Sequence, residues 1–258
     1  MIESPKSASL AQPLISGARA DSAAAPGKLR GDVWLTVQTR HAKRLITGRD
    51  RTDDKPAIIG LVGFADRVRV IWNAAKADDP YASWWLIKIE HALARARTRI
   101  NAERAALAAT LRHESAFDVE VAVSEKPYRL ALRFASPYAY RGALLVASFD
   151  ATACRVLTLQ HVGVLERAQA ERSLHLCASA VRRVFATPQG YRELGIDRAA
   201  VRAGSEAARA AAVSMGVVPL DVLSGECQAS LAPPPMRPTA AQAPHVEHAA
   251  ALPEGDSR

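Results

Sequence analysis

Residues 119–137 read VEVAVSEKPYRLALRFASP, and this stretch decides the fold class. Val119, Val121 and Val123 alternate with other residues, and a second alternating run follows a turn that ends at Pro127. The large apolar members of the second run are Tyr128, Leu130, Leu132 and Phe134. Strict alternation is typical of a strand with one buried face, so two such runs around a short turn predict a β-hairpin.

After this hairpin, capping residues predict a series of helices. Ser136 can cap a first turn that has Pro137 at its first position. Asp150 predicts the start of a further helix, and Asp197 predicts the start of the last one. The predicted helical ranges are 138–149, 151–164, 166–186 and 198–215, with a strand as the alternative for residues 143–149.

Before the hairpin, a strand and three helices are predicted. Residues 32–39 read DVWLTVQT, in which Val33, Leu35 and Val37 would form one apolar face of a strand. Thr39 can cap a short helix that Gly48 closes. Two longer helices are predicted over residues 57–77 and 80–112.

Together these elements predict an α+β fold that is mostly helical, with a small antiparallel sheet. They place a single domain at residues 31–226. Residues 1–30 and 227–258 are rich in Ala, Ser and Pro and lack an apolar period, so both are predicted to be disordered tails.

The charge of the chain lies mainly on the predicted domain. The formal net charge is +8, of which the two predicted tails contribute +2 and −1. Arginine supplies most of the excess, and its planar guanidinium pairs well with phosphate and guanine. The alternative is coding bias, since a GC-rich genome raises the Arg and Ala content together.

Several kinds of chemistry are not supported by the sequence. The chain has no nucleophile elbow and no phosphate-binding glycine loop, and its seven histidines lack the spacing of zinc ligands. Gly60 and Gly63 lie in an apolar helical pattern, which favours close packing over phosphate binding. The odd, scattered cysteines fit a reducing cytosol. They are Cys154, Cys177 and Cys227. We therefore expect a protein without enzymatic activity, metal or cofactor.

A cytoplasmic location is the further expectation. The N-terminus lacks a basic segment followed by an apolar run. The most apolar windows, residues 57–72 and 142–165, are each interrupted by charged residues, whereas a membrane-spanning helix needs about 20 mostly uncharged residues.

Two basic clusters remain as candidate binding sites. Arg40, Lys43 and Arg44 have the spacing of neighbours on one helical face. Arg129 and Arg133 lie four residues apart on a predicted strand, so they project to the same side about 13 Å apart. Because a two-stranded ribbon fits the DNA major groove, the second cluster could read bases. A solvated surface is the alternative for both clusters.

Three strings of this sequence resemble a known family. They are residues 32–40 (DVWLTVQTR), 58–66 (IIGLVGFAD) and 78–86 (DDPYASWWL). They resemble integrating conjugative element proteins that are related to AcaB-like transcriptional regulators of conjugative plasmids, and the resemblance spans about residues 31–216. It implies a DNA-binding activator of transfer genes with an embedded ribbon-helix-helix unit. Strand-helix-helix candidates begin at Asp32 and at Tyr128, and either could supply the ribbon.

Two functional hypotheses follow. In the first, the protein binds double-stranded DNA and regulates conjugative-transfer genes, and it forms a homodimer because ribbon readers pair strands across a two-fold axis. Arg129 and Arg133 would then reach bases. The expected phosphate contacts are Arg40, Lys43, Arg44 and Arg141.

In the second hypothesis, the chain is an accessory protein that binds another protein of the conjugation system. The adjacent Trp84 and Trp85 and the alanine-rich part of the long helix would form the docking surface. Packing in the core is the alternative role for this pair of tryptophans, and we favour it.

Overall fold

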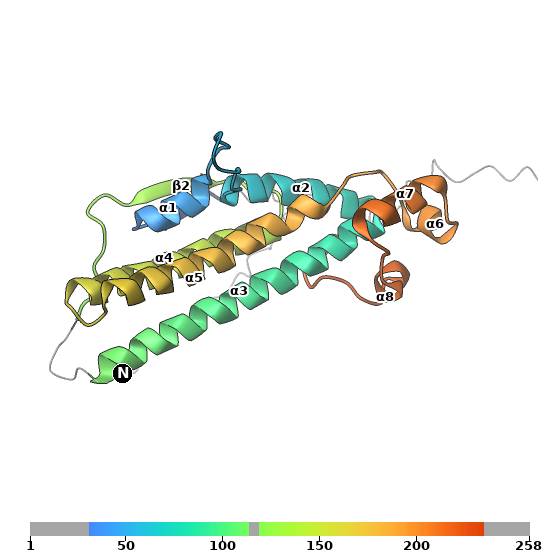
Figure 1. Cartoon of the computed structure of the whole chain (residues 1–258). Coiled ribbons are helices and arrows are strands. Elements are labelled where there is room, and N and C mark those ends of the chain that lie inside the picture. Colours follow the sequence, from blue (N-terminus) through green and yellow to red (C-terminus); the bar gives the residue numbers. More distant parts are fainter. Residues whose placement is uncertain (1–30, 114–118, 235–258) are drawn as a thin grey trace, which may run out of the picture. The chain divides into compact units, whose positions relative to one another are not determined.

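The computed structural model describes residues 31–113 and 119–234. By its contacts the chain divides into two units, Met1–Gly31 and Asp32–Arg258, and all the elements belong to the second unit. In chain order they are β1 (Val33–Val37), α1 (Arg40–Thr47), α2 (Leu61–Lys76), α3 (Pro80–His113), β2 (Tyr128–Leu132), α4 (Pro137–His161), α5 (Arg167–Ala186), the short 3₁₀ helix η1 (Thr187–Gly190), α6 (Arg198–Arg202), α7 (Glu206–Met215) and α8 (Leu220–Ser224). The predicted α+β class, mostly helical with a small antiparallel sheet, is confirmed (Figure 1).

The two strands of the sheet come from distant parts of the sequence. β1 pairs antiparallel with β2, with Val33 opposite Leu132 and Val37 opposite Tyr128. The predicted hairpin is therefore wrong, although the second of its two strands is present. Alternating apolar residues indicate a strand with one buried face, but they do not indicate which other strand pairs with that strand.

The first predicted hairpin strand is a loop segment beside the sheet. Its backbone bonds to side chains instead of a strand: Ala122 N donates to Thr158 Oγ1 at 3.0 Å, and Ser124 N donates to Gln38 Oε1 at 3.0 Å. Val123 is 76% exposed. β1, which pairs with β2 instead, has both Leu35 and Val37 buried.

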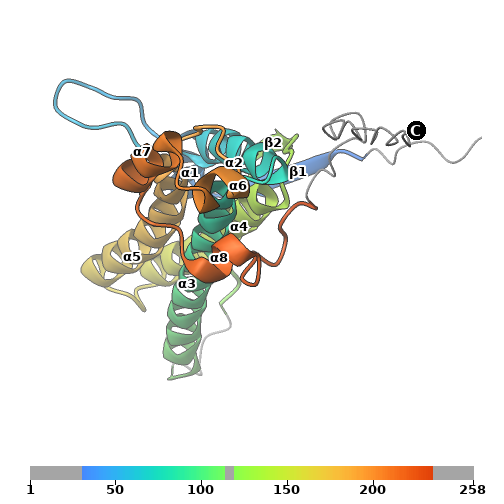
Figure 2. The ribbon, with the colours of Figure 1, turned by 90° about the vertical axis from the view of Figure 1, so that its right-hand side faces the viewer.

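The core is formed by four helices. α3, α4 and α5 pack against one another, and α2 packs on α3 and α4. α4 also contacts β1 and α1, so it lies between the sheet and α5 (Figure 2). The largest fully buried side chains on these helices are Phe64, Tyr81, Tyr138, Phe149 and Phe185.

Asp150 lies inside α4 and does not start a new helix, so the predicted break at this residue is wrong. Its side chain is buried, with the residue 4% exposed. The carboxylate accepts hydrogen bonds from Gln38 N at 2.6 Å, from Thr39 N at 2.9 Å and from Thr39 Oγ1 at 2.7 Å. The carboxylate oxygens of Asp150 bind Gln38 and Thr39 and do not cap the first turn of a new helix. The capping prediction is wrong for this reason.

The start of α1 is held by the same junction. Thr39 caps α1 as predicted, since Ala42 N donates to Thr39 Oγ1 at 3.1 Å. Because Asp150 binds both the amide and the hydroxyl of Thr39, one carboxylate fixes the place where β1 ends and α1 begins.

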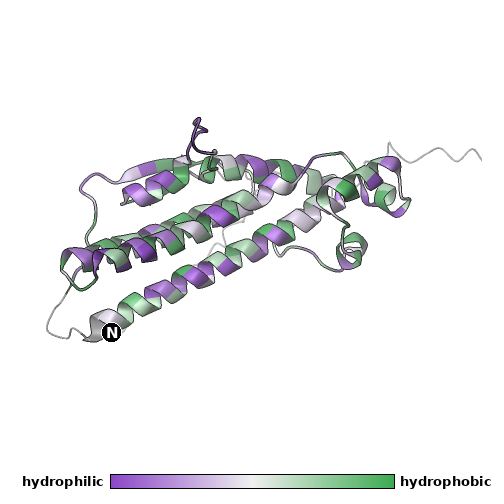
Figure 3. Ribbon diagram, in the orientation of Figure 1, coloured by the Kyte–Doolittle hydropathy of each residue, from purple (hydrophilic) through white to green (hydrophobic). Residues whose placement is uncertain are grey.

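Two glycines allow the chain to cross itself after α1. Gly48 has a φ of 74°, and a Cβ atom there would lie 2.3 Å from Ile58 O. A Cβ atom on Gly60 would lie 2.4 Å from Gly48 N. Residues 49–59 therefore leave and return as a closed loop, whose projecting part is hydrophilic (Figure 3). This crossing also explains why α2 begins at Leu61, four residues after the predicted start.

α3 begins as predicted. Asp79 accepts hydrogen bonds from Tyr81 N at 2.7 Å and from Ala82 N at 3.1 Å. The hydroxyl of Tyr191 also donates to Asp79, at 2.6 Å. Burial raises the pKa of the Asp79 carboxyl, and these three donors oppose the shift. The cap of the longest helix is thus tied to the segment that follows η1.

The C-terminal part differs from the prediction in two ways. The predicted helix over residues 198–215 is divided into α6 and α7 around Gly204, whose φ is 65°. Residues 227–234, which the sequence assigns to a tail, pack on the helices: Ser230 N donates to Glu90 Oε2 at 2.8 Å, and Leu231 N donates to Tyr138 Oη at 3.1 Å. The rest of the predicted tails, residues 1–30 and 235–258, lie outside the described residues.

α4 is long and apolar enough to cross a membrane by length and composition alone. However, 67% of its most apolar window is buried inside the protein, and Asp150 lies near its middle. Within the described residues, α4 is therefore the central helix of the core.

The Asp150 junction predicts a specific loss of stability. In Asp150→Asn, an amide NH₂ replaces a carboxylate oxygen beside three donors, so we expect the free energy of unfolding to fall by roughly 2–3 kcal/mol. Urea denaturation followed by circular dichroism measures this change. Asp66→Asn is the matched control, since Asp66 is exposed on α2, and it should cost at most about 0.5 kcal/mol. Equal stability of the two variants would contradict the role of Asp150.

The three cysteines should differ in reactivity. Burial raises the pKa of Cys154 and of Cys177 to about 11, whereas Cys227 is half-buried. Because only a thiolate attacks a disulfide reagent, we expect one rapid reaction with dithionitrobenzoate at pH 8 and two more after unfolding. Cys227→Ser should remove the rapid phase. Two rapid thiols in the native protein would be the contrary result.

Candidate nucleic-acid interface

The two-stranded sheet has one side on the core and one side exposed. Leu35, Val37 and Leu132 point inward and are buried. The exposed side, here called the ribbon face, consists of Trp34, Thr36, Arg129, Ala131 and Arg133. Arg133 directly follows the last residue of β2 and continues its alternation. The predicted placement of both arginines on one side of a strand fits this exposure pattern.

Arg129 is positioned by an aromatic ring on the neighbouring strand. Its guanidinium carbon lies 5.0 Å from the centroid of the Trp34 ring. A cation–π contact of this kind holds the guanidinium without using its N–H donors. Among the described residues, neither Arg129 nor Arg133 has a carboxylate within 4.0 Å. Both positive charges are therefore available to an anionic partner.

Lys43 brings the first basic cluster to the end of the two-stranded sheet. Its Nζ atom lies 5.1 Å from the centroid of the Tyr128 ring, and Tyr128 is the residue opposite Val37 in the sheet. Arg40 is the first residue of α1 and is exposed. α1 thus begins where β1 ends and adds positive charge there.

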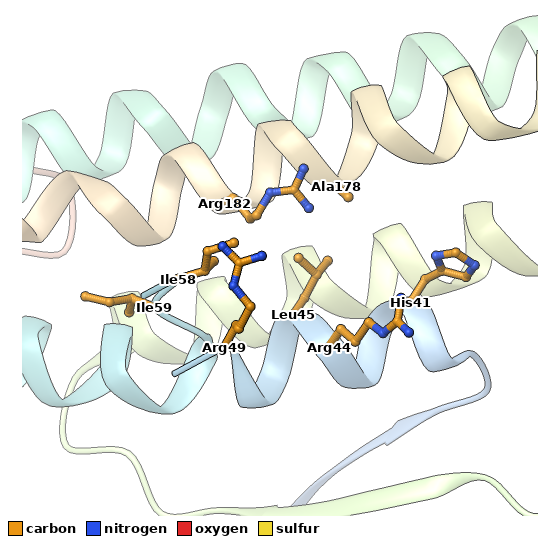
Figure 4. A pocket seen from close by; sticks show the side chains of 9 residues that line it. His41, Arg44, Leu45, Arg49, Ile58, Ile59, Ala178 and Arg182 are labelled. Atoms are coloured by element: carbon orange, nitrogen blue, oxygen red, sulfur yellow. The ribbon is translucent and has the colours of Figure 1, made fainter. Parts of the chain in front are cut away.

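Arg44 belongs to a different part of the surface. It lines a cavity between α1 and α5 together with His41, Arg49 and Arg182 (Figure 4). Partial burial and the charge of Arg44 lower the pKa of His41. The three predicted contacts of α1 consequently do not all lie beside the ribbon face.

Arg141 contacts α3 and not the ribbon arginines. It is exposed on the second turn of α4, and its Nη1 lies 4.0 Å from Glu90 Oε1 on α3. Glu90 in turn receives the hydroxyl of Tyr138 at 2.9 Å. A phosphate contact by Arg141 stays a prediction.

Trp34 is a candidate that the sequence reasoning missed. Its 51% exposure is unusual for a tryptophan, and it lies on the ribbon face next to Arg129. The alternation of residues 33–37 already placed it opposite the apolar face. That signal could have identified it as an exposed aromatic residue on a basic surface.

The tryptophan pair of α3 is part of the core, as we favoured. Trp85 is 5% exposed, and its Nε1 donates to Thr187 O at 3.2 Å. Trp84 is partly buried and packs edge-to-face on Trp85, with ring centroids 5.4 Å apart. Lys88 Nζ lies 3.2 Å from the centroid of the Trp84 ring and covers it further. The protein-docking role loses its main candidate.

Metal chemistry finds no support in the part of the chain that the structure describes. Within residues 31–113 and 119–234, no group of three or more His, Cys, Asp or Glu side chains could hold a metal ion.

Comparison with known proteins gives one family and one structure. The model of the family described as Transcriptional regulator AcaB matches residues 25–237. The crystal structure of selenomethionine-containing AcaB from uropathogenic E. coli is similar, with a TM-score of 0.51 and 14% identity. The similarity covers 76% of this chain and 95% of that chain. At this identity it concerns the fold alone. No match is found among curated protein sequences.

Proposed function

Because this chain belongs to the Transcriptional regulator AcaB family, we propose that it binds double-stranded DNA through the ribbon face. We further propose that it regulates conjugative-transfer genes of a mobile element, such as an integrating conjugative element, in the cytoplasm. The observation that carries the proposal is the pair Arg129 and Arg133, exposed on one side of a two-stranded ribbon without carboxylate partners.

The dimensions of the ribbon suit the major groove. The groove is about 12 Å wide and admits a two-stranded ribbon. Arg129 and Arg133 are about 13 Å apart along the strand, which corresponds to about four base pairs at 3.4 Å each. Each guanidinium could form a bidentate contact with the O6 and N7 atoms of a guanine. Trp34 adds an apolar surface that can touch a thymine methyl group.

Phosphate contacts would come from the helix ends beside the ribbon. Arg40 and Lys43 lie where β1 leads into α1, so they are well placed to bind the backbone next to the groove. In the proposal, Arg44 and Arg141 bind phosphates further away. Such contacts set the register on the duplex but carry no sequence information.

The arrangement of elements supports a ribbon-helix-helix-like unit formed by one chain. Each strand is followed within a few residues by a helix with a side-chain cap, α1 with Thr39 and α4 with Ser136. The sequence predicts a homodimer on the ground that each of two chains supplies one strand of the ribbon. Here one chain supplies both strands, so the ribbon itself does not require a second chain. In a homodimer, two complete ribbons would instead bind half-sites about one helical turn apart or a multiple of this.

Substitutions of the basic residues should separate base recognition from sequence-independent binding to the phosphate backbone. We expect Arg129→Ala and Arg133→Ala each to cost about 1–3 kcal/mol of binding and to relax the preference at one base pair. Lys43→Ala should weaken binding to all sequences and lower the slope of log K against log salt by about 1. Fluorescence anisotropy with a duplex selected from a random pool, titrated between about 50 and 200 mM salt, measures both effects.

Arg172→Ala is the matched control, because Arg172 is exposed on α5 and not on the ribbon face. It should bind the selected duplex like the wild type. The proposal fails if the wild type forms no complex at low salt, or if the double variant of Arg129 and Arg133 binds as tightly as the wild type.

A further inference from the structure

A cavity of about 470 Å³ opens between α1, α5 and the closed loop of residues 49–59 (Figure 4). Its charged side chains come from three separate segments: Arg44 from α1, Arg49 from the loop and Arg182 from α5. Arg49 and Arg182 reach into the space between the loop and α5 in Figure 4. A volume of this size lies within the range of small-molecule sites, about 300–1,000 Å³.

The positive charges of this cavity are not neutralised. None of its lining residues is acidic. Within the described residues, the side chains of Arg44 and Arg182 make no hydrogen bond to protein and have no carboxylate within 4.0 Å. Arg182 is half-buried, and this burial lowers the pKa of its guanidinium. A half-buried guanidinium with no acceptor is costly, and an anion would relieve that cost.

Arg49 is oriented toward the cavity by the protein itself. Its Nη2 donates to Pro56 O at 2.9 Å across the base of the loop. The loop is fixed in turn by the paired hydrogen bonds of Arg49 and Ile58, at 2.9 and 2.8 Å, and by the crossing of Gly48 and Gly60. The cavity wall is therefore held by backbone contacts.

The remaining lining is apolar. Leu45 is buried at the side of α1, and Ile58 and Ile59 are half-buried where the loop returns. Ala178 completes this side on α5. A ligand that fills the cavity would meet guanidinium groups on one part of its surface and aliphatic carbons on another.

We propose that this cavity binds a small amphipathic oxyanion, an organic phosphate or carboxylate with an apolar body. Guanidinium forks match the planar pairs of oxygen atoms on both groups. The cavity shares Arg44 with the DNA-binding proposal, but it needs neither the ribbon face nor DNA. It would link α5 to α1, the helix that also carries Lys43 at the end of the two-stranded sheet.

Anilinonaphthalene sulfonate, a fluorescent aromatic anion, is a direct probe for the full-length chain. We expect saturable binding of one molecule per chain, displaced by octyl phosphate or octanoate but not by octanol or inorganic phosphate. Whichever of octyl phosphate and octanoate displaces it at the lower concentration identifies the preferred oxyanion. Arg182→Gln and Arg49→Gln should each weaken binding at least tenfold, since each removes a charged hydrogen-bond donor group. Arg172→Gln, at an exposed position of the same helix, should change it less than twofold.

Three results would overturn the proposal. The first is that both cavity variants bind the probe as tightly as the wild type does. Inorganic phosphate could displace the probe as well as octyl phosphate does, so that the apolar side takes no part. Duplex DNA could displace it where octyl phosphate does not, which would make the arginines part of a DNA surface. The displacement experiments use the wild-type protein, so they test the proposal even if a variant loses its helical circular dichroism signal.

Discussion

The carboxylate of Asp150 is the interaction on which the arrangement of the sheet depends. It lies in the middle of α4, the central helix, and accepts three hydrogen bonds from Gln38 and Thr39. A buried carboxylate is costly unless it is paired or fully hydrogen-bonded, so the position of these donors is tightly constrained. The end of β1 and the first turn of α1 are thereby fixed to the core at one point.

The ribbon face follows from that constraint. With its C-terminal end held on α4, β1 presents Leu35 and Val37 to the core and Trp34 to the outside. β2 can then pair along β1, and its own alternation turns Arg129 outward beside Trp34. The basic residues of α1 start from the same junction, so Lys43 lies at the end of the ribbon. A single buried contact thus places charges from residues 40–43 and 129–133 on neighbouring parts of the surface.

Local features were predictable from the sequence, whereas pairing and burial of polar groups were not. Capping by Thr39, Asp79 and Ser136 depends on neighbouring residues, so sequence reasoning placed those helix starts correctly. The partner of β2 depends on packing some 90 residues away, and alternation carries no information about it. Asp150 resembles a helix cap in the sequence, because Asp is common at that position. Only the folded chain reveals that its carboxylate accepts hydrogen bonds from Thr39. The basic clusters were visible, but only the structure separates Lys43 from Arg44 and shows the cavity that contains Arg44.

In the proposed complex the ribbon face lies in the major groove of DNA, and guanine N7 atoms report on that groove directly. Methylation interference with dimethyl sulfate on a selected duplex is therefore the decisive measurement. If Arg129 and Arg133 bind guanines, interference is expected at guanines about four base pairs apart, with the signal at one of them lost in Arg129→Ala. Interference that is absent from guanine N7, or that does not change in Arg129→Ala, would contradict the proposed complex.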